Sequence, residues 1–260
     1  MFYLFIFIFG TIIGSFLNVV VIRTHDGGRI IKSRSQCPHC QHVLGTIDLI
    51  PLISFISQSG QCRYCRQPIA WQYPLVELVT GFLFVLVTYN IIGWLDWENL
   101  FYNSAVFLIW LRNLIFVGFL IIIFIYDLKW YLILDKITWP AMVIALILNL
   151  IIGFSWLDLL LGAVVGFGFF ALQYIVSNGR WIGGGDLRLG ALAGLMLGLK
   201  AVIVALFFAY IIGALISVFL LIWGRKELKS QIPFGTFLAL GIFLALLWSQ
   251  EVINWYLSIL

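Results

Sequence analysis

The chain has 260 residues, of which 63% are hydrophobic and only 10% are charged, far from the roughly 25% of charged residues in a soluble domain. The net charge of +4 does not indicate nucleic-acid binding, because lysine and arginine are clustered in connections beside apolar segments instead of along one solvated face. The composition therefore predicts a protein that lies mostly in the lipid bilayer and binds no nucleic acid.

Apolar segments of about 20 residues, long enough to cross the hydrocarbon layer as helices, recur from end to end. We expect the first to be a retained span, because no basic region precedes it and no small-residue cleavage site follows it. The sixth is short, and we expect it to be tilted, broken or re-entrant. The eight predicted spans cover residues 3–22, 74–92, 103–126, 137–154, 157–177, 187–199, 201–223 and 233–249.

Basic residues near the ends of spans are retained on the cytosolic side of a membrane. Alternate connections hold thirteen of the fifteen lysines and arginines, which predicts that these connections face the cytosol and that both termini lie outside. Arg112 lies within an apolar segment, and we expect it to have a structural role, either at the start of the third span or reaching outward. The thirteen residues are Arg23, Arg29, Lys32, Arg34, Arg63, Arg66, Lys129, Lys136, Arg180, Arg188, Arg225, Lys226 and Lys229.

The connection from residue 23 to residue 73 contains all four cysteines as two C-x-x-C pairs, CPHC and CRYC, with twenty-one residues between them. Two such pairs can present four thiolates tetrahedrally to Zn²⁺, and the ion supplies folding energy to a loop without its own core. Disulfide bonds are the alternative, but a cytosolic location favours reduced cysteines. With four cysteines available, neither His39 nor His42 is predicted to be a ligand. The predicted zinc ligands are Cys37, Cys40, Cys62 and Cys65.

Three aspartates, Asp127, Asp135 and Asp186, lie at predicted cytosolic ends of apolar segments, where an acidic side chain costs roughly 2.5–3.5 kcal/mol on insertion scales. Each could cap a helix or pair with a nearby basic residue such as Arg188, and Asp135 fits this structural interpretation best. Asp186 differs because it follows three glycines, which lower helix propensity and let the backbone approach a substrate closely.

Two carboxylates held together in a low-dielectric pocket share a proton and titrate as a unit. One can deprotonate a water molecule that attacks a peptide carbonyl, while the other protonates the carbonyl oxygen. Other nucleophiles have little support, since the three histidines all lie in the four-cysteine connection and no GxSxG motif is present. The residues therefore favour aspartate chemistry.

Six motifs follow one another along nearly the whole chain. They are GSFLNVVVIR at 14–23, the two cysteine pairs taken together, YPLVELVTG at 73–81, YDLKWYLILD at 126–135, GGGDLRLG at 183–190 and IPFGTFLALG at 232–241. In this order they resemble the motifs of the type IV prepilin leader peptidases, a family of membrane aspartyl proteases also called prepilin peptidase/N-methyltransferase. A GxGD motif alone also suggests presenilin-like proteases, so the combination is much more specific than any single motif.

The resemblance implies that Asp127 and Asp186 are the catalytic pair and that Asp135 is a non-catalytic acid. It implies a prepilin or pseudopilin substrate, whose short basic leader is cut after a glycine, and a location in the bacterial cytoplasmic (inner) membrane with the active site facing the cytosol. It also implies methylation of the new N-terminus with S-adenosylmethionine, without indicating which residues bind this cofactor.

The chain departs from the usual family pattern at a few positions. Leu134 and Arg188 stand where the family usually has proline and lysine, and residues 24–25 are Thr-His where the family commonly has an RLP sequence. Arginine keeps the positive charge of lysine but changes its shape, so we expect peptidase activity to be retained. Glu77, in the PLVEL segment, could serve the methyl transfer or the fold.

The predicted fold is an all-α polytopic membrane protein with about eight transmembrane helices and a cytosolic four-cysteine zinc-binding loop. Residues 1–22 are predicted to form the first transmembrane helix, residues 23–73 the zinc-binding loop with the methyltransferase part, and residues 74–260 the aspartyl peptidase domain. The expected partners are the prepilin substrate and membrane lipid. Two other functions remain open: a different GxGD membrane protease, which the cysteine loop disfavours, and a transporter, which the cytosolic placement of both acids disfavours.

Overall fold

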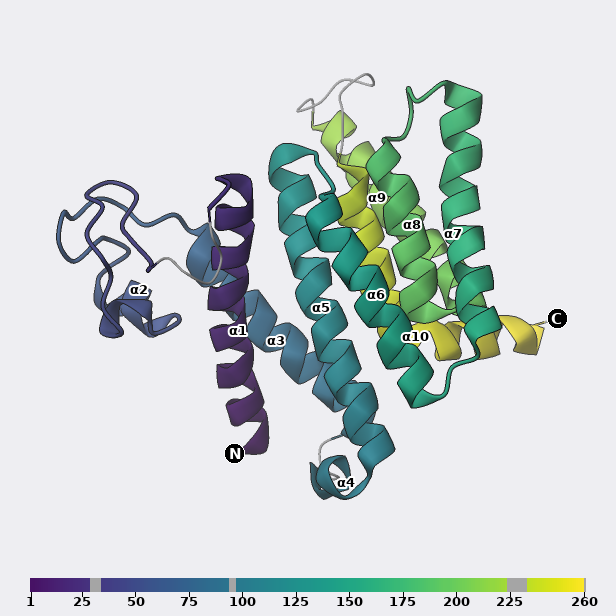
Figure 1. Cartoon of the computed structure of the whole chain (residues 1–260), viewed down its shortest axis with the longest axis horizontal. Helices are drawn as coiled ribbons and strands as arrows, with labels where there is room; N and C mark the ends of the chain where they lie inside the picture. Colours follow the sequence, from purple (N-terminus) through teal and green to yellow (C-terminus); the bar gives the residue numbers. More distant parts are fainter. Residues whose placement is uncertain (29–33, 94–96, 224–232, 260) are drawn as a thin grey trace. The chain divides into compact units, whose positions relative to one another are not determined.

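The computed structural model describes residues 1–28, 34–93, 97–223 and 233–259 (Figure 1). Apart from two isolated β-bridges, this described part contains only helices, turns and loops, so the predicted all-α class is confirmed. The helices are α1 (Phe2–His25), the 3₁₀-helix η1 (Ile47–Leu49), α2 (Ile53–Ser57), α3 (Gln72–Ile92), α4 (Trp97–Tyr102), α5 (Ser104–Trp130), α6 (Asp135–Ile152), α7 (Trp156–Ser177), α8 (Gly184–Leu197), α9 (Leu199–Ile222) and α10 (Phe234–Ile259).

Some residues used in the sequence-based predictions lie outside the described part of the chain. Five of them are basic residues that contribute to the predicted orientation, and one is the first residue of the last motif. They are Arg29, Lys32, Arg225, Lys226, Lys229 and Ile232.

Within the described residues, seven helices are long and apolar enough to cross a membrane. They coincide with seven of the eight predicted spans and are α1, α3, α5, α6, α7, α9 and α10. The predicted span at 187–199 corresponds to α8, which has only 14 residues. At 1.5 Å per residue α8 is about 21 Å long, shorter than the roughly 30 Å hydrocarbon layer.

The chain forms two compact units, Met1–Val106 and Phe107–Leu260. In the first unit, α1 and α3 pack so closely that a Cβ atom added at Gly10 would lie 2.7 Å from the Cα atom of Gly81. Small residues at such crossings let membrane helices gain packing energy through backbone contact. The connection that carries the cysteines therefore starts and ends on a firmly packed helix pair.

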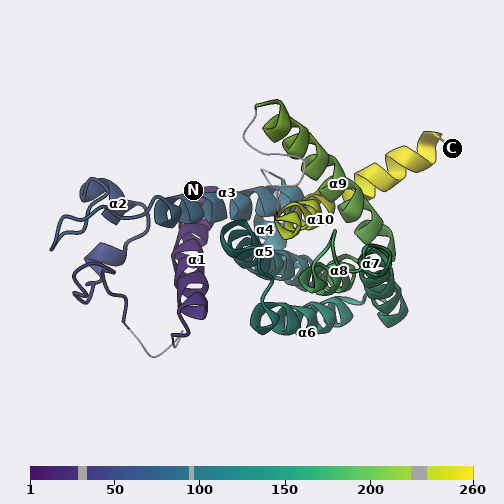
Figure 2. The same cartoon turned by 90° about the horizontal axis from the view of Figure 1, so that it is seen from above.

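Helix α8 lies inside the second unit, surrounded by α6, α7, α9 and α10 (Figure 2). Leu189 and Leu192 of this helix are fully buried. Gly190 faces Gly166 of α7, and a Cβ atom at either position would overlap the backbone of the other helix. Because protein and not lipid surrounds α8, the helix can be shorter than the bilayer.

Arg112 is buried inside α5, with 7% of its surface exposed. Its guanidinium donates a hydrogen bond of 2.8 Å to Oδ1 of Asn149 in α6. Asn149 in turn donates hydrogen bonds of 2.6 and 3.1 Å to the carbonyl oxygens of Leu195 and Met196 at the end of α8. Arg112 neither starts the third span nor reaches outward, because α5 already begins at Ser104 and hydrogen bonds hold the side chain inward. Its contacts, which join α5 to α6 and through Asn149 to α8, agree with the expected structural role.

Candidate active site and cysteine cluster

Asp127 lies in the last turn of α5 and is 5% exposed. Its Oδ2 atom accepts a 2.7 Å hydrogen bond from the backbone N–H of Thr236, and the N–H of Gly235 also faces the carboxylate. Both N–H groups belong to the first turn of α10, where backbone donors have no partner within the helix. The start of α10 therefore holds the carboxylate of Asp127 in one orientation.

Asp186 lies in the first turn of α8 and is 9% exposed. Its Oδ2 atom accepts a 3.1 Å hydrogen bond from the backbone N–H of Gly183. Asp186 is outside the seven candidate spans. Burial first, and then the charge of Asp127, raise the pKa of its carboxyl group, and the Gly183 N–H opposes both; together they move this pKa from 3.8 to about 7. The structure thus brings the two predicted catalytic residues into electrostatic contact.

Ile133, in the connection between α5 and α6, lies beside Gly185, the residue that precedes Asp186, and beside Gly235, which faces the carboxylate of Asp127. A Cβ atom added at Gly185 would be 2.9 Å from the Cβ atom of Ile133, and one added at Gly235 would be 3.0 Å from its Cδ1 atom. The same added atom at Gly235 would be 2.9 Å from Oδ2 of Asp127. Sequence reasoning did not select Ile133, because nothing in a lone isoleucine of an apolar motif indicates contact with two distant glycines.

Asp135 is exposed at the start of α6 and forms an ion pair with Arg188 of α8. This pair links α6 to α8 close to Asp186 in sequence. Arg188 is among the basic partners considered for Asp135 from the sequence, and the pairing gives Asp135 a structural contact. An exposed ion pair of this kind contributes at most about 1 kcal/mol.

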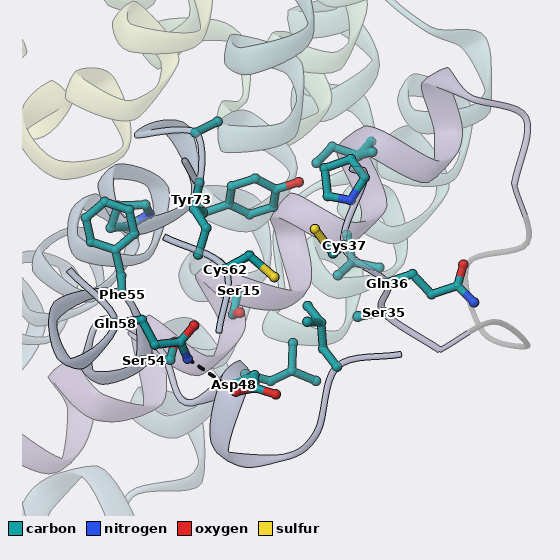
Figure 3. Close-up of a pocket in the computed structure, with 18 of the residues that line it drawn as sticks. Ser15, Ser35, Gln36, Cys37, Asp48, Ser54, Phe55, Gln58, Cys62 and Tyr73 are labelled. Carbon is teal, nitrogen blue, oxygen red and sulfur yellow. Dashed lines mark hydrogen bonds between the residues drawn. The ribbon is translucent and has the colours of Figure 1, made fainter. Parts of the chain in front are cut away.

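The four cysteines come together in the first unit, with their Sγ atoms within 4.8 Å of one another and without disulfide bonds. Figure 3 shows two of these sulfur atoms, those of Cys37 and Cys62. Both pairs form the same turn. The backbone N–H of the first cysteine donates a hydrogen bond to the carbonyl oxygen five residues later, and the carbonyl oxygen of that cysteine accepts a hydrogen bond from the N–H four residues later. That fourth residue, Gln41 or Arg66, has a φ of 57° in both turns. Neither His39 nor His42 joins the cluster.

The donor set fits a tetrahedral zinc ion. With Zn–S bonds of about 2.3 Å, tetrahedral sulfurs lie about 3.8 Å apart, and the Sγ atoms of Cys37 and Cys65 are 3.8 Å apart. Burial raises the pKa of the Cys37 thiol, but backbone N–H groups of Cys40 and His39 and neighbouring sulfurs outweigh it and lower this pKa to about 7. For Cys65 the N–H of Gln67 lowers the pKa, whereas burial and the other three sulfurs raise it to about 12. A divalent cation would offset the repulsion that keeps four adjacent thiols from ionising together.

Two buried carboxyl groups in electrostatic contact can share a proton, which is the chemistry that an aspartic peptidase requires. Two family models match the chain: the bacterial peptidase A24 N-terminal domain over residues 8–91, and the type IV leader peptidase family over residues 114–218. Together with the relatives below, these matches show that the chain belongs to the type IV leader peptidase family, as its motifs predict.

Several curated relatives are named prepilin leader peptidase/N-methyltransferase. The one from Bacillus subtilis (strain 168) is 33% identical over 256 residues and covers 97% of both chains. The one from Aeromonas hydrophila is 31% identical over 282 residues, covering 97% of this chain and 93% of the relative. The one from Myxococcus xanthus (strain DK1622) is 34% identical over 237 residues, covering 89% and 67% respectively. No solved structure gives a significant match.

Proposed function

We propose that this aspartic peptidase cleaves the leader peptides of type IV prepilins or pseudopilins with Asp127 and Asp186 as its catalytic pair. The observation that carries this proposal is the electrostatic contact between two buried carboxylates, each hydrogen-bonded to backbone N–H groups. The names of the relatives from Bacillus subtilis and Aeromonas hydrophila support the substrate class.

The two aspartates would divide the proton transfers of peptide hydrolysis. With a pKa of about 7, Asp186 keeps its proton in many molecules near neutral pH and can donate it to the scissile carbonyl oxygen. Asp127, oriented by the N–H of Thr236, accepts a proton from the attacking water. The pair then returns a proton to the leaving amine, so that no covalent intermediate is required.

The proposed active site faces the cytosol, with both termini on the other side of the bacterial inner membrane. The distribution of lysine and arginine between alternate connections supports this orientation. A short basic leader would remain on the same side, so that substrate and carboxylates meet at one membrane face.

A second activity, methylation of the newly exposed N-terminal amine, is supported by the names of the relatives. S-adenosylmethionine would supply the methyl group when bound, with its S–C bond replaced by an N–C bond and a proton lost from the amine. The cysteine cluster would hold zinc through Cys37, Cys40, Cys62 and Cys65, giving the loop around them a folding centre.

The test of the peptidase proposal is the cleavage of a prepilin by purified protein, scored by mass spectrometry of the products. Asp127→Asn and Asp186→Asn should each abolish cleavage, because neither amide can replace a titrating carboxyl group. Asp135→Asn, which removes only an exposed ion pair, should leave most of the activity. Full cleavage by either of the first two variants would overturn the assignment of the pair.

A further inference from the structure

A cavity of about 360 Å³ lies beside the cysteine cluster, within the unit Met1–Val106 (Figure 3). The C-terminal half of α1, the cysteine-containing connection and the start of α3 form its walls. Cys37 and Cys62, which line it, are each 5% exposed. Its volume is within the range of about 300–1,000 Å³ that small-molecule sites occupy.

Glu77 of α3 lines this cavity with a carboxylate that is nearly buried, the residue being 7% exposed. Its Oε2 atom accepts a 2.8 Å hydrogen bond from the backbone N–H of Leu52, and the hydroxyl of Ser15 also donates to the carboxylate. Among the described residues no lysine or arginine forms an ion pair with Glu77. A buried carboxylate without a cationic partner favours a ligand that brings a positive charge.

Other side chains in the cavity wall suit two further groups of one ligand, an aromatic base and a carboxylate. Tyr73 and Phe55 offer aromatic rings, on which a purine base can stack. Arg23 and Arg34 bring positive charge to the same cavity, suited to a carboxylate group. The other acid in the lining, Asp48, is already engaged by Gln58, Tyr64 and Arg63, so it stabilises the wall.

We propose that this cavity is the binding site for S-adenosylmethionine, with the Glu77 carboxylate facing its sulfonium. This inference rests on the proposed methyltransferase function and assigns it a location. A cationic sulfonium, a purine and a terminal carboxylate match the buried acid, the aromatic rings and the arginines together. A basic leader peptide matches the acid but is repelled by the arginines, so it fits this cavity less well.

The experiment measures binding of two probes to the purified, zinc-loaded full chain in detergent by isothermal titration calorimetry. S-adenosylmethionine carries the sulfonium charge, whereas S-adenosylhomocysteine lacks it. Glu77→Gln keeps the shape and an acceptor for the Leu52 N–H but removes the charge. It should weaken S-adenosylmethionine binding roughly 10- to 100-fold and leave S-adenosylhomocysteine binding nearly unchanged.

A second pair of variants tests the cavity without touching Glu77. Val19→Trp, on the cavity wall, should abolish binding of both probes because the indole fills the space. Ile12→Trp, on an exposed position of the same helix, should bind both as the wild type does. Equal zinc content and thermal stability of the variants confirm that differences arise from binding.

The possible results separate this proposal from the function on which it rests. Wild-type binding that neither Glu77→Gln nor Val19→Trp affects would overturn the cavity as the site, while the methyltransferase proposal would stand. A wild-type protein that binds no S-adenosylmethionine and methylates no cleaved pilin would overturn both. Displacement of bound S-adenosylmethionine by a basic leader peptide, at the wild-type but not the Glu77→Gln protein, would assign the cavity to the leader instead.

Discussion

Gly184 and Gly185 are adjacent residues of the GGGD motif with different surroundings. A Cβ atom at Gly185 would lie 2.9 Å from the Cβ atom of Ile133, and within 3.4 Å of two more of its carbons. At Gly184 an added Cβ atom would have no neighbour within 4 Å among the residues that the structure describes. Only Gly185 therefore depends on the absence of a side chain for close packing.

Gly185→Ala should lower the rate of prepilin cleavage by roughly one to two orders of magnitude. The added methyl group forces Ile133 to move, and Ile133 packs on Gly235, whose backbone lies beside the carboxylate of Asp127. Gly184→Ala is the matched control and should cleave at the wild-type rate, since its methyl group points into open space and alanine favours the helix. Steady-state cleavage of a prepilin peptide measures both. Equal rates for the two variants would contradict the role of Ile133.

The raised pKa of Asp186 links the protonation of the protein to its stability. The carboxyl group has a pKa of about 7 in the folded chain, against an ordinary value of 3.8 that applies to the unfolded chain. Between these two values the folded state binds more protons than the unfolded state, so the free energy of unfolding falls as pH rises. Above about pH 7 both states are ionised at this group, and the fall ends.

The free energy of unfolding of Asp186→Asn should therefore fall less than that of the wild type as pH rises from about 4 to about 7. The measurement is thermal unfolding in detergent at a series of pH values, for the wild type and the variant. Asp135→Asn serves as the control for a change of charge at an exposed site. If the wild type and Asp186→Asn have parallel stability curves across this interval, Asp186 is not a carboxyl group with a raised pKa.

At the scale of the elements, α8 is held at its end and along its side. Asn149 bonds to the carbonyl oxygens of Leu195 and Met196, which have no partner within the helix. Along its side, Gly190 packs on Gly166 of α7 so closely that no other residue type fits at either position. These contacts fix the helix whose first turn carries Asp186.

Gly166→Ala should reduce the free energy of unfolding by about 2–3 kcal/mol, since the added methyl group overlaps the carbonyl of Gly190 and forces α7 and α8 apart. Gly168→Ala, two residues further along α7, adds a methyl group with no neighbour within 4 Å in the described part of the chain, and it should be neutral or slightly stabilising. Unfolding of the two purified variants by denaturant in mixed micelles gives the comparison. A Gly166→Ala protein as stable as Gly168→Ala would disprove the close packing.

The sequence predicted the long helices well because a membrane span needs a continuous apolar segment, and that requirement is local. It did not predict the end of α10, which continues to Ile259 through Gln250, Glu251 and Asn254, beyond the predicted end at residue 249. Nor did it settle the length of α8, which is possible only because neighbouring helices cover it. Both features depend on surroundings that a hydropathy pattern does not contain.

The candidate sites also contain features that local sequence predicts and features that depend on how distant segments pack. The C-x-x-C spacing sets a local turn, so the sequence predicted which sulfurs come together, and the four cysteines form one cluster. The motif resemblance pointed to Asp127 and Asp186, and their contact depends on how α5, α8 and α10 pack. Glu77 stood out in the sequence as an acid in an apolar segment, but its place in a cavity wall depends on how distant segments fold beside it. Ile133 carries no signal of its own, and its contacts appear only once distant segments are placed beside it.

At the scale of the whole molecule, the two candidate sites lie in different units. The cysteine cluster and the cavity with Glu77 lie in Met1–Val106, whereas Asp127 and Asp186, with their hydrogen-bond partners, lie in Phe107–Leu260. A change that unfolds the cysteine loop therefore leaves the hydrogen-bond partners of both aspartates in place. This separation predicts that loss of the metal affects the two proposed activities unequally.

Elemental analysis of the purified chain should find about one zinc ion per molecule, as four tetrahedral sulfur ligands predict. Cys37→Ser with Cys62→Ser should lose the metal and with it S-adenosylmethionine binding, because both residues line the cavity wall. Cleavage of the prepilin should continue, since the partners of the aspartates are untouched. His39→Ala, which alters a flanking residue outside the cluster, should keep its zinc. The zinc site would be contradicted by a wild-type protein that contains no metal and has disulfide-bonded cysteines. The separation of the two activities would be contradicted if the double variant lost cleavage while its second unit remained folded.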